Sequence, residues 1–301
     1  MSRVVFVTGA SGFIGNAVAR RYASAGYQVY GLTRSADKSK SLLQAEITPV
    51  IGEVNKPETY EKIIEQSQIV IHTATGVTNT PFEDDKIVVD TVARISAKSA
   101  SKKLFILTSG CLIYGGKISP ETYFNEDSDL NIPPWIGWRR KVELLVLGSS
   151  DFVGTVARPA FLYGGSGSYT GPYFSMAEEK KLVVSGSPDK KWSFIHAADL
   201  AEGYLLIAEA PRSNVKGEIF NFGDGTRSTI KEVVLAAAKA VGYNGEITYV
   251  PAGNDFMGVN AEQSCLLDCS KARKLLGWVP KHFGFVEDIE RYYATWKAYQ
   301  K

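Results

Sequence analysis

Three glycines that follow an apolar run near the start of the chain constrain its fold more than any other feature. The stretch RVVFVTGASGFIG contains Gly9, Gly12 and Gly15, spaced as GxxGxxG rather than GxGxxG. The run before them is typical of a buried strand, and GNAVARRYASAG predicts a helix after them. Glycines at such a turn permit positive φ and leave backbone N–H groups open to a phosphate at the helix N-terminus. The turn therefore predicts a dinucleotide site, although a tight turn without a ligand would carry the same glycines.

Short apolar runs alternate with helical patterns up to about residue 110. We expect strands over 3–9, 28–34, 48–54, 68–74 and 103–110, separated by helices that include a long one over 82–101. Near-continuous apolar strands joined by helices are typical of a parallel sheet, because right-handed crossovers cover both of its faces. The sequence predicts an α/β fold with a doubly wound parallel sheet.

The second half of the chain is less regular. A polar, Pro-rich stretch over 119–134 precedes a Trp- and Arg-rich helix, a sixth strand over 155–165 and loops rich in glycine and aromatic residues. Further on we expect a strand and helix over 192–210, strands over 217–223 and 247–251, a helix opened by the capping box Thr229 and Glu232, a short helix capped by Asp268, and a closing amphipathic helix. We predict a dinucleotide-binding domain over 1–160 and a mainly substrate-binding part over 161–301, with about 190–225 returning to the first domain.

Charge and cysteine content narrow the range of partners. The 34 basic and 32 acidic residues leave no electrostatic footprint for nucleic acid or an anionic membrane, and no run of about 18 apolar residues occurs. Three cysteines and three histidines form neither a disulfide framework nor a zinc pattern. We expect a cytoplasmic protein without a metal that binds a small molecule.

The end of the second strand predicts which phosphates the dinucleotide carries. An acidic residue there would accept from a ribose 2′-hydroxyl, whereas a cation tolerates a 2′-phosphate. The sequence reads GLTRS, with Thr33 followed by Arg34. This favours NADP over NAD, unless Arg34 is only a solvated loop cation.

Six blocks of the sequence resemble the short-chain dehydrogenase/reductase superfamily, in its extended, epimerase/dehydratase-like branch. In order along nearly the whole chain they are TGASGFIG, VIHTAT, LTSGCLIYG, RPAFLYG, WSFIHAADLAEGY and DCSKARKLLGWVPK. The resemblance implies a Rossmann domain, a smaller C-terminal substrate-binding part, a nicotinamide cofactor and usually a Ser, Tyr, Lys catalytic set. Related folds often form homodimers through helices beside the active site.

The resemblance assigns the cofactor-binding residues position by position. It places six residues in the dinucleotide turn: Gly9, Ser11, Gly12, Phe13, Ile14 and Gly15. Thr73 and Ala74 match the loop beneath the cofactor. Glu53, followed by Val54, stands where relatives commonly have an Asp near the adenine.

The catalytic set departs from the family pattern. The usual serine position is Gly110, with Ser109 one residue early. Aligning Glu143 with the Glu that follows YxxxK places Trp135 at the tyrosine and Arg139 at the lysine, whereas aligning Lys141 with the lysine places Gly137 at the tyrosine. A literal YxxxK over 293–297 lies in the last helix and is interpreted as chance. The chain is similar to atypical members that keep the glycine turn and lose the Tyr and Lys pair.

Ser109, Tyr114 and Arg139 are the remaining candidates for catalysis. Arg139 stays cationic, so it could bind the ribose and stabilise an alkoxide, but it is a poor acid. The proton would come from Tyr114, or from a water ordered by Ser109 and Arg139; Tyr114 could equally be a packing residue. For His72 and His196 the sequence favours structural roles.

Five aromatic residues could line an apolar pocket or pack in the core: Trp135, Trp138, Trp192, Tyr173 and Phe174. A pocket of this kind would suit an aromatic or lipophilic carbonyl compound rather than a nucleotide sugar. The first hypothesis is therefore an NADP-dependent reductase of such a compound. Two alternatives are an epimerase, dehydratase or isomerase without net redox change, and a non-catalytic protein that senses NADP or binds a partner.

Overall fold

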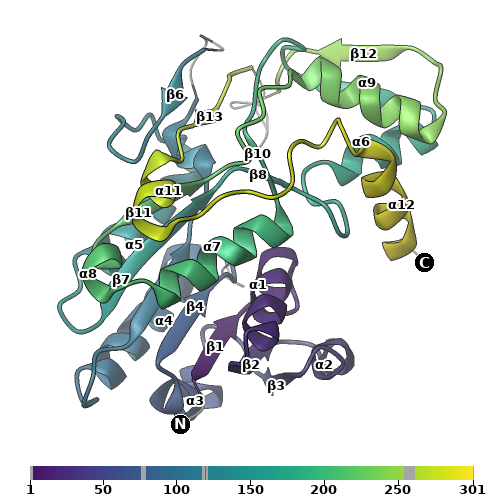
Figure 1. Ribbon diagram of the computed structural model, residues 1–301. Helices are drawn as coiled ribbons and strands as arrows, with labels where there is room; N and C mark the ends of the chain where they lie inside the picture. The colour runs from purple at the N-terminus through teal and green to yellow at the C-terminus, as the bar shows by residue number, and fades with distance from the viewer. Residues whose placement is uncertain (1–2, 76–78, 117–118, 120, 254–261, 301) are drawn as a thin grey trace.

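The computed structural model describes residues 3–75, 79–116, 119, 121–253 and 262–300. A seven-stranded parallel sheet in the order β11-β7-β5-β4-β1-β2-β3 forms its centre (Figure 1). The strands are β1 (Val4–Thr8), β2 (Gln28–Thr33), β3 (Ile47–Ile51), β4 (Ile69–His72), β5 (Leu104–Thr108), β7 (Val153–Pro159) and β11 (Ile219–Phe222). The predicted doubly wound parallel sheet is confirmed. Because the order of strands reverses between β1 and β4, a crevice for a ligand is expected at their carboxyl ends.

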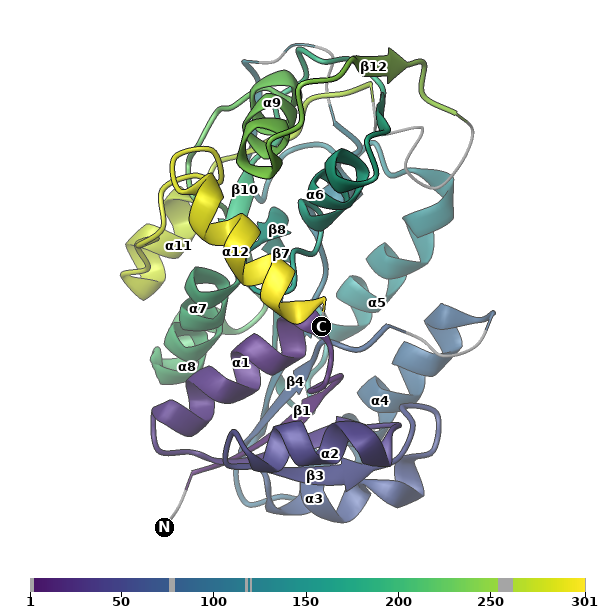
Figure 2. The ribbon, with the colours of Figure 1, turned by 90° about the vertical axis from the view of Figure 1, so that its right-hand side faces the viewer.

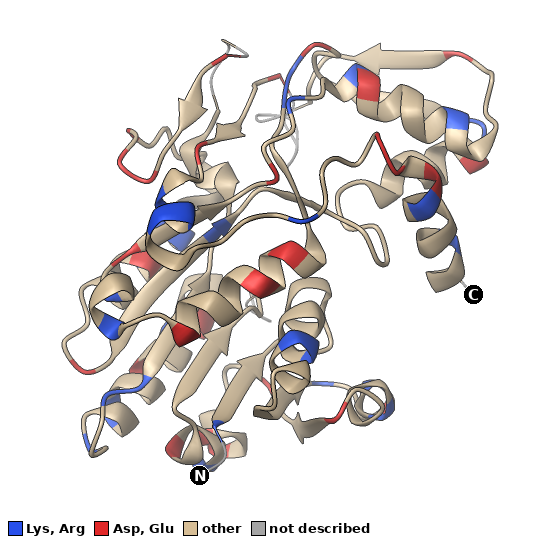
Figure 3. Cartoon of the chain, in the orientation of Figure 1, with Lys and Arg blue, Asp and Glu red and all other residues tan. Residues whose placement is uncertain are grey.

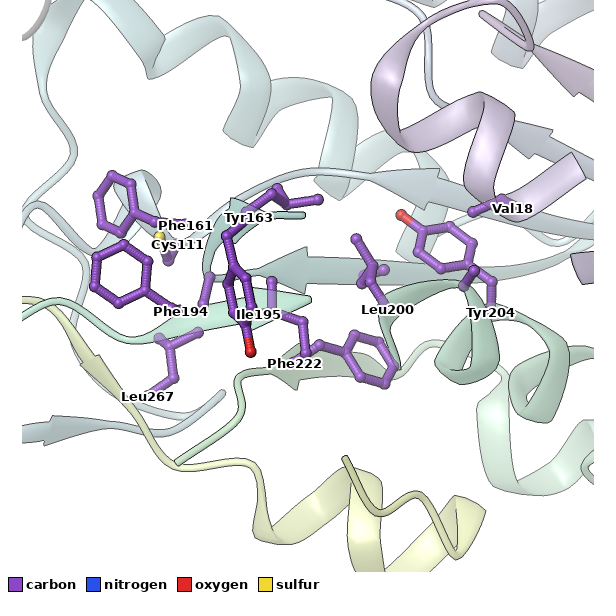
Figure 4. Packing of buried hydrophobic residues seen from close by; sticks show 14 of the residues in the cluster. Val18, Cys111, Phe161, Tyr163, Phe194, Ile195, Leu200, Tyr204, Phe222 and Leu267 are labelled. Carbon is purple, nitrogen blue, oxygen red and sulfur yellow. The ribbon is translucent and has the colours of Figure 1, made fainter. Parts of the chain in front are cut away.

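Helices cover both faces of this sheet, and each face has its own hydrophobic cluster. Val5 and Val7 pack toward α1 (Phe13–Ser24) and α7 (Ala197–Glu209), whereas Phe6 packs toward α4 (Pro81–Ser96) and α5 (Gly137–Leu147). Figure 4 shows Leu200 and Tyr204 of α7 close to Phe222 of β11. Successive side chains of a strand point to opposite faces of the sheet. Because helices cover both faces, the strands are apolar throughout.

The remaining helices and strands extend the molecule beyond the carboxyl ends of the sheet. Figures 1 and 2 show α6 (Gly171–Glu178), α9 (Ile230–Val241) and α12 (Ile289–Tyr299) on that side. Three two-stranded parallel pairs accompany them: β8 (Phe161–Tyr163) with β10 (Phe194–His196), β9 (Leu182–Ser185) with β12 (Ile247–Val250), and β6 (Tyr123–Phe124) with β13 (Leu266–Leu267). Short helices complete the fold: η1 (Pro57–Thr59), α3 (Glu61–Gln66), η2 (Cys111–Tyr114), η3 (Pro134–Ile136), α8 (Arg212–Val215) and α11 (Ser270–Leu276).

Several local predictions can be compared with the structure. The capping box at Thr229 is confirmed, because its side chain accepts from the Glu232 N–H and the Glu232 side chain accepts in return. Asp268 accepts from the Ser270 N–H, but Cys269 rather than Asp268 is the N-cap of α11. The helix expected over 82–101 ends at Ser96. The sequence missed α2 (Ala36–Leu43), and α6 lies where only loops were expected.

Charged residues are spread over the described part of the fold. Acidic and basic residues are interspersed along the helices and loops (Figure 3). Among the described residues no helix is both long and apolar enough to cross a membrane, and no group of three or more His, Cys, Asp or Glu side chains could hold a metal.

Candidate active site

A cleft of about 370 Å³ lies at the carboxyl ends of the central strands, at the crevice expected from their order. All six residues assigned to the dinucleotide turn line it, together with Arg34, Val54, Thr73 and Ala74. The structure therefore brings together ten of the eleven residues assigned to cofactor binding. Other lining residues, which the sequence did not single out, include Lys38, Gly52, Thr75, Leu162 and Tyr169.

The glycine turn is packed too closely to admit a Cβ at Gly9 or Gly15. Gly9 has φ +68°, a conformation that favours glycine. A Cβ on Gly15 would lie 2.2 Å from the Gly9 carbonyl oxygen and 2.5 Å from Thr73 Oγ1. The N-cap of α1 is Gly12, and no side chain caps this helix end. The turn thus has the bare helix N-terminus that a diphosphate requires, and the residues present fit a nicotinamide dinucleotide.

Two cations line the cleft beyond the end of β2. Thr33, at the end of β2, donates from Oγ1 to Ser11 Oγ at 3.0 Å. Arg34 follows it, and Lys38 lies one helical turn later in α2; both are exposed and both line the cleft. Reasoning from the sequence missed Lys38 because α2 was not predicted. A helix start at Ser35, just after Arg34, would have placed Lys38 in the first turn of that helix, close to Arg34.

Glu53 is not among the residues that line the cleft, and its place near the adenine stays a prediction. Its carboxylate pairs with Lys56 Nζ at 2.8 Å, three residues further along. Gly52 and Val54 line the cleft on either side of it.

A second cavity, of about 320 Å³, adjoins the first. Ile14, Thr75, Leu162 and Tyr169 line both. The other residues that line the second cavity are mostly apolar or aromatic, and Ser109 and Arg139 are polar. The apolar and aromatic ones are Gly110, Cys111, Leu112, Trp135, Ile136, Trp138, Pro159, Ala160 and Phe161. A molecule in this cavity would therefore lie next to a dinucleotide in the cleft.

Two of the five aromatic residues expected in an apolar pocket line this cavity. They are Trp135 in η3 and Trp138 in the first turn of α5. Trp192 instead stacks on Phe161 with ring centroids 4.0 Å apart, and its Nε1 donates to the Gln263 carbonyl. Phe174 packs against α12, and Tyr173 precedes it in α6; neither lines the cavity. Core packing accounts for these three.

Arg139 lies in the first turn of α5, and its side chain reaches the cavity. Its side chain is almost buried, and Nη1 donates to Asp85 Oδ2 at 2.8 Å. Its guanidinium carbon lies 4.1 Å from the centre of the Trp138 ring. Burial lowers the pKa of Arg139, and the Asp85 carboxylate opposes that shift. Asp85 gave no signal in the sequence, because only the fold brings α4 beside α5.

Ser109 lies directly after β5 and lines the same cavity. Its backbone N–H donates to the Ala157 carbonyl at 2.8 Å. Its Oγ is buried without a well-aligned partner among the described residues, although it lies near enough to Glu143 to help lower the pKa of that carboxyl. Burial alone would raise the pKa of Glu143, but the hydrogen bonds and charge of Arg158, together with hydrogen bonds from Ser109 and Arg140, hold that pKa below its usual value.

Tyr114 lies outside the cavity, which corrects its assignment as a proton donor. It is fully buried and stacks on Phe124 with centroids 5.0 Å apart. Its hydroxyl donates to Asn221 Oδ1 at 2.8 Å, and burial raises its pKa to about 12. A phenol held this way in the core has no route to a substrate, so the packing interpretation applies.

Two other sequence features have structural roles. Tyr293 and Lys297, the literal YxxxK, both bind the Glu178 carboxylate and so join α12 to α6. His196 caps α7, with Nδ1 accepting from the Ala198 N–H at 3.2 Å, and stacks on His282.

Comparison with known proteins agrees with this architecture. A model of the NAD dependent epimerase/dehydratase family matches residues 5–223. An uncharacterized protein of Schizosaccharomyces pombe is 25% identical over 303 residues, which cover 95% of this chain and 97% of that protein. The 4-hydroxy-2-methyl-3-oxo-4-farnesyl-3,4-dihydroquinoline-1-oxide ketoreductase of Stigmatella aurantiaca is 23% identical over 258 residues, 82% of this chain and 75% of its own.

Solved structures show the same fold. The UDP-glucose 4-epimerase of Thermotoga maritima, solved with UDP-glucose, superimposes with a TM-score of 0.83 at 19% identity and covers 99% of this chain and 100% of its own. The family model spans most of the chain, and the glycine turn, sheet order and cleft agree with it. The protein is therefore an NAD(P)-dependent enzyme of the short-chain dehydrogenase/reductase superfamily, and it belongs to the NAD dependent epimerase/dehydratase family.

Proposed function

We propose that the protein is an NADP-dependent reductase of a small aromatic or lipophilic carbonyl compound. The observation that carries this proposal is the apolar cavity beside the dinucleotide cleft, with Trp135 and Trp138 in its wall. Sites for small apolar ligands are mostly aromatic with few polar anchors, and here the anchors would be Ser109 and Arg139. The ketoreductase relative, whose name describes a farnesylated quinoline substrate, supports the same substrate class.

Arg34 and Lys38 support a preference for NADP over NAD. Both cations line the cleft beyond the end of β2, and Thr33 stands where an acidic residue would favour a free ribose hydroxyl. The glycine turn would hold the diphosphate, and Thr73 and Ala74 would lie beneath the cofactor. The bound nicotinamide would supply a hydride to the carbonyl carbon.

The residues of the cavity would act on the carbonyl oxygen. Arg139 stabilises negative charge that develops there, since its guanidinium is fixed in place and stays protonated. Ser109 offers a hydroxyl on the same cavity wall. With Tyr114 held in the core, the proton would come from the Ser109 hydroxyl or from a water that Ser109 and Arg139 order.

A spectrophotometric assay tests the proposal. The purified protein is mixed with NADPH and a panel of aryl ketones, terpenoid ketones and aldehydes, and the loss of NADPH absorbance is followed. We expect oxidation of NADPH with at least one lipophilic member, and weaker oxidation of NADH. Saturable NADPH binding without oxidation by any carbonyl compound would contradict a reductase, and no binding of either nucleotide would contradict the cofactor assignment as well.

A second candidate function is an epimerase, dehydratase or isomerase that returns its hydride to the product. The match to the NAD dependent epimerase/dehydratase family favours it, and so does Trp135, an indole, at the position that aligns with the usual reductase tyrosine. Such an enzyme would convert substrate with catalytic amounts of cofactor. Product formation that exceeds the NADPH consumed would therefore select this function over the first.

A further inference from the structure

We infer that Asp85 is a specificity-determining residue that positions Arg139 and cancels its charge, so that the cavity admits uncharged carbonyl compounds and excludes carboxylates and phosphates. This inference rests on the proposed function, because it defines the substrate class of the same cavity.

Arg139 is held on two sides. Asp85 Oδ2 accepts from its Nη1 at 2.8 Å, and the Trp138 ring lies against its guanidinium at 4.1 Å. The Asp85 side chain is fully buried and that of Arg139 is 9% exposed. A buried carboxylate that is this close to a guanidinium is a fixed counter-ion, because moving either group away would leave an uncompensated charge in the interior.

A buried hydrogen-bond chain fixes Asp85 in turn. The other oxygen, Oδ1, lies 3.0 Å from His72 Nε2, and a carboxylate only accepts, so Nε2 carries the proton. His72 Nδ1 lies 2.7 Å from Thr8 Oγ1, which itself accepts from the Ala74 N–H. The contacts with His72 and Arg139 hold both carboxylate oxygens of Asp85, and the Arg139 and Asp85 pair has no net charge.

Nothing else in the described cavity wall supplies a charge. Of the described residues that line it, Arg139 alone is charged at neutral pH, because the others are glycine, proline, threonine, serine, apolar residues, or the neutral Cys111 and Tyr169, whose pKa values are raised by a hydrogen bond with Cys265 and by burial, respectively. The nearby Glu143 is bound by Arg158 and Arg140. The Arg139 and Asp85 pair therefore decides the charge that a ligand meets.

An anionic substrate would be disfavoured for this reason. To pair with Arg139 it would have to displace Asp85, which would leave a buried carboxylate unpaired, or it would have to enter an apolar cavity without a counter-ion. A neutral carbonyl oxygen can accept from the guanidinium while the pair stays intact. The geometry therefore favours ketones and aldehydes without charged groups.

Two probes of the same shape test the inference. Acetylnaphthalene is neutral and naphthoate is an anion, and binding of each to the whole protein, with and without NADP, is measured by quenching of tryptophan fluorescence. We expect the wild-type protein to bind the ketone at least about tenfold more tightly, and Asp85→Asn to shift the preference toward naphthoate by at least about tenfold, because Arg139 is then uncompensated. Asp90→Asn, the same change on the exposed side of α4, is the matched control and should leave the preference unchanged.

Two further variants make the outcome decisive even if Asp85→Asn folds poorly. Arg139→Gln alone leaves Asp85 negative, so naphthoate binding should fall further. In the double variant Asp85→Asn/Arg139→Gln the cavity is neutral again, and the preference for the ketone should return. An unchanged preference in a folded Asp85→Asn protein, naphthoate binding by the double variant equal to that of Asp85→Asn, or no binding of either probe to the wild type would overturn the inference.

This test is independent of catalysis. If the preference shifts as expected but no carbonyl compound oxidises NADPH, the reductase proposal fails and the role of Asp85 stands. If NADPH is oxidised but the preference does not shift, the role of Asp85 fails and the reductase proposal stands.

Discussion

Arg139 is the residue on which the proposed chemistry of the cavity depends. The sequence allowed two alignments for the lost tyrosine and lysine, and the structure distinguishes them. Trp135 and Arg139 both line the cavity, whereas Lys141 is exposed and Gly137 has no side chain to offer. The alignment that anchors on Glu143 therefore describes this site, with an indole and a guanidinium in place of a phenol and an ammonium.

Substitution of Arg139 tests this assignment. Arg139→Gln should lower kcat/KM for a carbonyl substrate by about 10² to 10³, the usual effect of removing one oriented donor. Lys141→Gln, two residues along the same helix, should leave kcat/KM within about twofold, since surface changes have small effects. Steady-state kinetics with NADPH measure both. Equal losses in the two variants would instead point to damage to α5.

Arg34 and Lys38 lead to a prediction about nucleotide preference. Each exposed cation near a 2′-phosphate is expected to contribute up to about 1 kcal/mol. Arg34→Ala and Lys38→Ala should therefore each weaken NADPH binding by about fivefold and leave NADH binding unchanged, as measured by fluorescence titration. Lys40→Ala, which lies in α2 but does not line the cleft, is the control. Equal losses of NADPH and NADH binding would show that the two cations do not bind the 2′-phosphate.

At the scale of the elements, the central strands could be predicted and much of the second half could not. Runs such as LFILT are apolar on both faces because helices pack on both, and this pattern is visible in a single sequence. In α6, glycine, proline and aromatic residues resemble a loop, and the helix forms because Phe174 packs against α12, more than a hundred residues later. Contacts between residues so far apart in the chain produce no periodic pattern in the local sequence.

The same limit applies to the candidate site. The glycine turn is local, so its residues could be assigned from the sequence. Asp85 and Arg139 are 54 positions apart, and only the packing of α4 on α5 makes them partners. Tyr114 is assigned to the site for a local reason that proves misleading. Its position after β5 resembles a catalytic one, but in the core its hydroxyl donates to Asn221.

The junction between β10 and α7 leads to a prediction about pH. Burial, helped by His282, lowers the pKa of His196 to about 4 from an ordinary value of 6.5. Between these values the unfolded chain binds more protons than the folded one, so the free energy of unfolding decreases as pH falls through this window. His196→Asn retains an oxygen to cap α7 and removes the titration.

The measurement is the melting temperature at about pH 7.5 and about pH 5. The loss of stability on acidification should be smaller in His196→Asn than in the wild type. Asp224, whose pKa burial raises to about 6, acts in the opposite direction, but it is present in both proteins and cancels in the comparison. An identical loss in both would mean that His196 does not titrate across this range.

At the scale of the whole molecule, the cofactor cleft is built from distant parts of the chain. The glycine turn, the end of β2 and the loop after β4 provide one side, and Leu162, Ser168 and Tyr169, after β7, provide another. A dinucleotide that contacts both sides binds the folded protein and not the unfolded chain. Its binding therefore stabilises the whole fold, by about 2.7 kcal/mol at a hundred times its dissociation constant.

Gly15→Ala tests this coupling. A Cβ at this position would lie 2.2 Å from the Gly9 carbonyl oxygen, so the turn must change shape and the diphosphate loses its place. We expect saturating NADPH to raise the melting temperature of the wild type by several degrees and that of Gly15→Ala little or not at all. In Gly137→Ala the new methyl group meets open space, so the full shift should remain. Because the readout is the shift that NADPH causes, any loss of stability from the substitution itself is subtracted; a full shift in Gly15→Ala would contradict binding at the glycine turn.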